Sequence, residues 1–79
     1  MTFGKILKSK RLQKRWTQEE LSEKLLISRP TISSWESDET LPDISNLLKI
    51  SVLFGCTLYD LCVVQQYTYE YRVKFLIRS

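Results

Sequence analysis

Apolar residues recur along this chain with two different periods. Over most of the chain they stand three or four positions apart, as Phe3 and Leu7 do, which is the spacing of one face of an α-helix. Over residues 67–77 they alternate with polar residues, except at Leu76, and this alternation is the period of a β-strand. The pattern therefore predicts a mainly α protein, with a helical domain over residues 1–63 and a C-terminal β-strand extension over residues 64–79.

Capping residues locate the predicted helices. Thr17 and Glu20 have the spacing of a capping box, so a helix should begin at about Gln18. Ser28 is a second N-cap candidate, and Gly55 is a C-cap. Together these signals predict five helices: Phe3 to about Lys14, one from about Gln18, one after Ser28, one over Ile44 to Phe54, and a short one that Thr57 opens and that is complete by Cys62.

The helix after Ser28 has two different faces. Ile32 and Trp35, three positions apart, form an apolar stripe that should be buried, so Trp35 is predicted to be a core residue and not a base-stacking one. The outward face consists of Arg29, Pro30, Thr31, Ser33 and Ser34. A helix that presents a guanidinium and hydroxyls, and that is supported by a preceding helix across a tight turn, suits a DNA major groove, which admits one helix.

At these residues the sequence resembles the helix-turn-helix domains of Cro/cI-type phage repressors, the XRE-like family. The resemblance covers about Phe3 to Cys62. Its motifs are Arg11, Thr-Gln-Glu-Glu-Leu at 17–21, Ile27, Ser28, Ile32, Ser33, Trp35, Glu36, Pro42, Leu47, Ile50, Gly55 and Leu61. The chain departs from the family where Leu26 replaces the usual Gly of the turn and where Asp38 and Glu39 replace Gly and Lys. Asp38 can adopt the left-handed conformation that Gly normally supplies.

The resemblance implies a sequence-specific, dimeric DNA-binding transcriptional regulator, in family terms a repressor. It places base contacts at Ser28, Arg29, Pro30, Thr31 and Ser34, and phosphate contacts at Lys10, Arg11, Gln18 and Ser33. Arg29 could bind guanine O6 and N7 together, or could contact only phosphate. Pro30 biases Arg29 away from helical geometry, which allows the helix to start one residue late and to aim Arg29 differently.

Arg11 lies one turn beyond Leu7, on the face of its helix that should turn inward. The family resemblance pairs it with Glu36, and a charge on that face needs a partner. We expect this ion pair to brace the first helix against the third, a role that can coexist with a DNA contact. Trp16, just before the capping Thr17, is expected to pack in the core against Leu21.

Charge is distributed unevenly along the 79 residues, whose net charge is +3. Residues 1–36 carry eight Lys or Arg against four Glu, whereas residues 37–64 carry one Lys against four carboxylates. The positive part contains the predicted helix-turn-helix. This asymmetry favours phosphate binding there, although charged runs are usually only solvated surface.

Other classes of function find little support in the sequence. The chain has no His, no nucleophile beside a base and no phosphate-binding glycine loop, so we expect no enzyme activity, cofactor or small-molecule ligand. Cys56 and Cys62 lack a metal-ligand spacing and are interpreted as small core residues, so no metal is expected. No apolar run reaches membrane-spanning length and no secretory signal is visible, which predicts a cytoplasmic protein.

The predicted strand has no partner within the chain. A strand with two open edges is unstable, so we expect two copies to pair antiparallel about a two-fold axis near Tyr71. The residues expected to form this dimer are Tyr67, Tyr69, Glu70, Tyr71, Arg72, Val73 and Phe75. The alternative is a protein-interaction module, such as an antitoxin or anti-repressor, whose C-terminal strand binds another protein.

Overall fold

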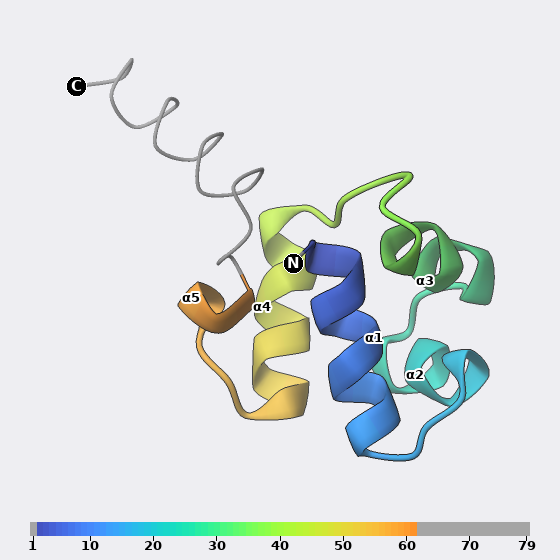
Figure 1. Cartoon of the computed structure of the whole chain (residues 1–79), viewed down its shortest axis with the longest axis horizontal. Helices are drawn as coiled ribbons and strands as arrows, with labels where there is room; N and C mark the ends of the chain where they lie inside the picture. The colour runs from blue at the N-terminus through green and yellow to red at the C-terminus, as the bar shows by residue number, and fades with distance from the viewer. Residues whose placement is uncertain (1, 62–79) are drawn as a thin grey trace.

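A computed structural model of the chain describes residues 2–61 (Figure 1). These residues form five helices: α1 (Phe3–Gln13), α2 (Gln18–Leu25), α3 (Arg29–Glu36), α4 (Ile44–Phe54) and α5 (Leu58–Leu61). The predicted mainly α domain of five helices is therefore confirmed. The strand predicted for residues 67–77, the segment 64–79 and Cys62 lie outside the described residues.

Polar side chains cap the helices where the sequence predicted. Thr17 and Glu20 form a complete capping box, with the Glu20 amide donating to Thr17 Oγ1 at 3.0 Å and the Thr17 amide donating to Glu20 Oε1 at 3.1 Å. Thr57 and Asp60 exchange the same two bonds, at 3.1 and 2.9 Å, at the start of α5. Gly55 ends α4 with φ of 63°, a conformation that glycine adopts without a steric cost.

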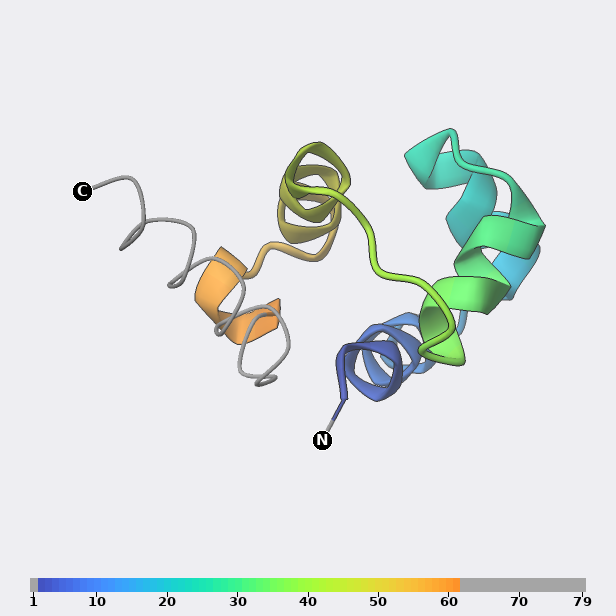
Figure 2. The same cartoon turned by 90° about the horizontal axis from the view of Figure 1, so that it is seen from above.

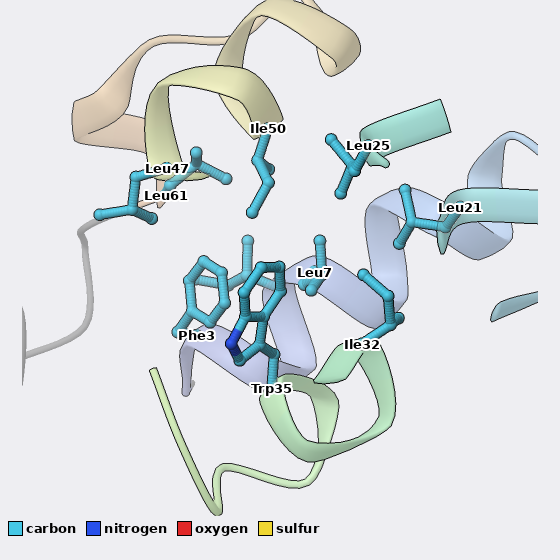
Figure 3. Packing of buried hydrophobic residues seen from close by; sticks show 10 residues of the cluster. Phe3, Leu7, Leu21, Leu25, Ile32, Trp35, Leu47, Ile50 and Leu61 are labelled. Carbon is cyan, nitrogen blue, oxygen red and sulfur yellow. The ribbon is translucent and has the colours of Figure 1, made fainter. Parts of the chain in front are cut away.

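The helices enclose one apolar core. α1 packs against α3 and α5, while α2 packs against α3 and α4 (Figure 2). In Figure 3, Trp35 from α3 lies beside Phe3 and Leu7 from α1, and Ile50 from α4 faces them. The buried apolar side chains are Phe3, Ile6, Leu7, Leu21, Leu25, Ile32, Trp35, Leu47, Ile50 and Leu61. The outward side of α3 is thereby left free, because its apolar stripe is anchored in this core.

Two aromatic predictions have different outcomes. Trp35 is 3% exposed, which confirms it as a core residue. Trp16 is only half-buried at the edge of the core, where its ring lies 5.6 Å from that of Phe54 and Lys24 Nζ lies 4.6 Å from its centroid. Cys56 is also half-buried against the core.

Asp38 performs two tasks in the loop after α3. Its φ of 64° confirms that it takes the left-handed conformation expected in place of Gly. In addition, its Oδ1 accepts a hydrogen bond of 2.9 Å from the amide of Gly4, in the first turn of α1. The first four amides of a helix have no partner inside the helix, so Asp38 satisfies one of them from a distance of 34 residues.

Candidate nucleic-acid interface

The amino-terminal end of α3 is an exposed surface on a fixed base. Ser28 has the extended conformation of an N-cap, and its carbonyl accepts the Ile32 amide at 3.1 Å, which closes the first turn. Ser28, Arg29 and Pro30 are exposed, while Ile32 is fully buried. This burial difference holds α3 in one rotation about its axis and presents the same residues outward.

The helix begins at Arg29 and not one residue later, which the sequence had left open. Pro30 stands in the first turn, where the amide that it lacks would have no helical partner, so it costs the helix no hydrogen bond. The turn closed by Ser28 outweighs the bias that Pro30 imposes on its predecessor.

Two pairs of hydroxyl groups hydrogen-bond to each other on α3 and in the segments that flank it. Ser28 Oγ and Thr31 Oγ1 are 2.8 Å apart, and Ser34 Oγ and Thr40 Oγ1 are also 2.8 Å apart. Thr31 and Ser34 are half-buried. Each hydroxyl has one hydrogen to donate and two lone pairs, so every pair keeps one free hydrogen and further acceptor capacity. Thr40, which the sequence did not single out, therefore joins this surface from the loop that follows α3.

Arg29 is the most prominent cation of this surface. Within residues 2–61 its guanidinium makes no hydrogen bond or ion pair, so all its donors are available. It lines an open hollow of about 580 Å³ at the start of α2. The other lining residues are Arg11, Thr17, Gln18 and Glu19. The fold thus brings Arg29, Arg11 and Gln18 to one place, although they are up to 18 positions apart in the sequence.

Arg11 and Glu36 form the predicted ion pair, and its geometry is bidentate. Arg11 Nε donates to Glu36 Oε2 at 2.7 Å, and Nη2 donates to Oε1 at 2.9 Å. A third donor, Nη1, bonds the Trp16 carbonyl at 2.8 Å, and Gln18 Nε2 donates to Glu36 Oε1 at 3.1 Å. The two charged side chains are only 9% and 4% exposed. The hydrogen bond with Glu36 raises the pKa of Arg11 above its usual value, so the guanidinium stays charged.

This network joins α1, the start of α2 and the end of α3. It confirms that Arg11 braces α1 against α3. The side-chain nitrogen Nε2 of Gln18 is used in the bond to Glu36, whereas the backbone N–H of Gln18 remains at the open end of α2. The phosphate contacts predicted for Arg11 and Gln18 stay predictions. The sequence alone did not indicate the bond between Gln18 and Glu36, which needs the packing of α2 against α3.

The remaining phosphate candidates lie in two places. Ser33 is exposed on α3. Lys10 instead lies on α1, which packs against α5, and its charge lowers the pKa of Asp60 on α5, a pKa that hydrogen bonds from Thr57 lower more strongly. Figures 1 and 2 show α5 and α3 on opposite sides of α1. The structure therefore brings Ser33, but not Lys10, to the surface around Arg29.

Residues 2–61 contain neither a metal-binding cluster nor a membrane-spanning helix. Among these residues, no group of three or more His, Cys, Asp and Glu side chains could hold a metal ion. In the same part of the chain, no helix is both long and apolar enough to cross a membrane.

Comparison with known families identifies the arrangement. A family model described as helix-turn-helix matches residues 7–61. The chain belongs to this family. The match includes α2, α3 and the turn between them, and it confirms the resemblance to Cro/cI-type domains on which the sequence prediction rested.

Two characterised relatives carry the same helix-turn-helix domain within longer chains. The HTH-type transcriptional activator BcrR of Enterococcus faecalis is 41% identical over 61 residues, which are 77% of this chain and 30% of BcrR. The HTH-type transcriptional regulator ImmR of Bacillus subtilis (strain 168) is 43% identical over 55 residues, which are 70% of this chain and 43% of ImmR. The matched region is thus less than half of either relative.

Solved structures share the fold of this helix-turn-helix domain. The P22 c2 repressor, solved in complex with synthetic operator 9T, matches with a TM-score of 0.73 and 30% identity over 77% of this chain and 92% of the repressor chain. A hypothetical transcription factor, NHTF from Neisseria, matches with a TM-score of 0.71 and 25% identity over 87% of this chain and 79% of that chain.

Proposed function

We propose that this chain is a sequence-specific DNA-binding transcriptional regulator that inserts α3 into the major groove of double-stranded DNA. The observation that carries the proposal is the exposed amino-terminal end of α3, where Arg29 is free of partners within residues 2–61 and Ile32 and Trp35 anchor the opposite face. The recognition helix of a helix-turn-helix protein contacts base edges with its amino-terminal residues. The P22 c2 repressor, which has the same fold, was solved on operator DNA.

In this proposal Arg29 reads a base pair, and other groups position the protein. Arg29 donates two hydrogen bonds to guanine O6 and N7, an interaction that is worth about 1–3 kcal/mol of discrimination between bases. Ser28, Thr31 and Ser34 supply hydroxyls, and Pro30 supplies apolar contact. Gln18, at the positive end of α2, contacts a backbone phosphate, together with Arg11 and Ser33. We further propose repression, because a protein that only occupies an operator can block transcription.

Replacing Arg29 with alanine is expected to relax base preference at one position of each half-site, at a cost of about 1–3 kcal/mol on the preferred sequence. Replacing Gln18 with alanine should weaken binding to all sequences about equally. Affinities measured by fluorescence anisotropy on single-base duplex variants, at several salt concentrations, distinguish the two. Thermal melts control for the loss of the Gln18 bond to Glu36. If Arg29→Ala lowers affinity uniformly, Arg29 is a phosphate contact and the assigned role is wrong.

We also propose that the regulator acts as a homodimer closed by residues 66–79, so that two copies of α3 are presented about 34 Å apart, one turn of DNA. Support comes from the alternation of apolar and charged residues in that segment, with Glu70 placed to face Arg72 of a second copy. Deleting residues 66–79 should give a monomer that binds a half-site weakly. Light scattering decides: a truncated protein that is still dimeric rules out this interface, and a full-length monomer favours a foreign partner.

A further inference from the structure

Exposed apolar side chains gather where the end of α2 meets the outer side of α4. Leu48 and Val52, one turn apart on α4, are 47% and 80% exposed, and Leu26, in the turn after α2, is 85% exposed. They line an open hollow of about 500 Å³. The full set of lining residues is Lys24, Leu25, Leu26, Leu48, Lys49, Val52 and Leu53. Scattered exposed leucines are ordinary, but a set that shares one hollow is a candidate for a binding surface.

The stability of the fold does not explain why a leucine stands at position 26. It ends α2 in the left-handed conformation, with φ of 56°, whereas α4 ends in the same conformation with Gly55. An L-residue is strained there, while glycine is not. Asp38, which is also left-handed, forms a hydrogen bond to the Gly4 amide, but a leucine side chain can form none. An exposed, strained leucine at the rim of an apolar hollow is therefore better explained by contact with a binding partner than by the stability of the fold.

The charges around the hollow indicate which partner fits. Lys24 and Lys49 are among the residues that line it, and none of the lining residues is acidic. Residues 62–79 of the same chain carry three basic residues and one acidic residue, so they would bring like charge to these lysines. A second copy that docked through the same hollow would bring its own two lysines. A partner with carboxylates beside apolar side chains complements this surface better than residues 62–79 or a second copy would.

We propose that this hollow docks an apolar segment flanked by carboxylates from a different protein. Apolar side chains of the segment lie against Leu26, Leu48 and Val52, and its carboxylates pair with Lys24 and Lys49. The inference goes beyond DNA binding and does not depend on it, because none of these five residues has a role in the proposed DNA contact.

Two synthetic peptides of equal length test the proposal with the full-length protein. Both carry the same leucines in helical spacing, and one has Glu where the other has Lys. We expect the Glu peptide to bind saturably and to shift the backbone amide resonances of Leu26, Lys49 and Val52 in NMR spectra. The Lys peptide should not bind.

Substitutions in the hollow provide the controls. Leu26→Gly should weaken binding of the Glu peptide about tenfold, because one large apolar contact is lost, yet should melt no lower than the wild type, because glycine relieves the left-handed strain. Val52→Asp should weaken binding of the Glu peptide as much, because the new carboxylate would repel those of the peptide. Tyr59→Ser, at a side chain that is 77% exposed and outside the hollow, should change nothing. An unchanged affinity in Leu26→Gly overturns the proposal.

Each competing occupant has its own signature in the same spectra. If the resonances of Leu26 and Val52 move with protein concentration, a second copy fills the hollow. If Tyr71→Ser moves them, the chain's own carboxy-terminal segment fills it. Either of these results refutes docking of an acidic partner. Equal binding of the two peptides refutes it as well, and so does a lack of saturable binding of the Glu peptide. A failure of the protein to bind duplex DNA would refute the proposed function and leave this result unaffected.

Discussion

Replacing Glu36 with alanine is expected to destabilise the fold by about 3–5 kcal/mol, because Arg11 would keep its charge in a nearly buried position without a counter-ion. The loss is severe for a small domain, since the total stability of such proteins is about 5–15 kcal/mol. Urea unfolding followed by circular dichroism measures it. Glu39→Ala, which removes an exposed carboxylate from the following loop, serves as the matched control and should change stability by less than about 0.5 kcal/mol.

A double-mutant cycle shows whether the ion pair is the cause. Arg11→Ala should also destabilise, because Glu36 would then be left with only the Gln18 bond. The double variant Arg11→Ala/Glu36→Ala should lose less stability than the two single changes added together, since neither charge is left buried alone. Strict additivity would show that the two side chains do not interact in solution.

Replacing Gly4 with alanine is expected to destabilise the fold by about 2 kcal/mol. A Cβ on Gly4 would lie 2.5 Å from the Glu36 carbonyl oxygen and 2.6 Å from that of Trp35. Both are backbone atoms, so α1 and α3 must separate, an overpacking cost of about 3 kcal/mol from which the better helix propensity of alanine subtracts about 1 kcal/mol. The same shift should stretch the bond from Gly4 to Asp38.

Lys8→Ala, an exposed change on the same helix, is the control for Gly4→Ala and should leave the midpoint of thermal unfolding almost unchanged. Gly4→Ala should lower that midpoint by about 8–16 °C, because its expected cost is about 2 kcal/mol and about 1 kcal/mol corresponds to roughly 4–8 °C in a domain of this size. Equal melting of Gly4→Ala and the wild type would mean that α1 does not approach α3 as closely as described.

The sequence predicted those features that depend on neighbouring positions. Thr17 with Glu20 is a local pair that sets where a helix begins, and the structure confirms it. Thr57 was predicted to open the last helix, and it does so through the same two bonds with Asp60. The apolar stripe of Ile32 was visible for the same reason, because helical periodicity fixes which residues share a face.

Contacts between distant segments were predicted only where the family resemblance supplied the partner. Arg11 and Glu36 were paired in this way. The bond from Gly4 to Asp38 and that between Ser34 and Thr40 were not, since each depends on how a loop and a helix come together. The strand over residues 67–77 and its dimer lie outside the described residues and stay predictions.

Selection of bound sequences from a random pool of DNA duplexes tests sequence-specific binding most directly. We predict enrichment of a motif with two-fold symmetry and a guanine in each half-site, and we predict that selection with Arg29→Ala loses the preference at that guanine alone. Enrichment of no motif by a folded, full-length protein would contradict a base-reading role for α3.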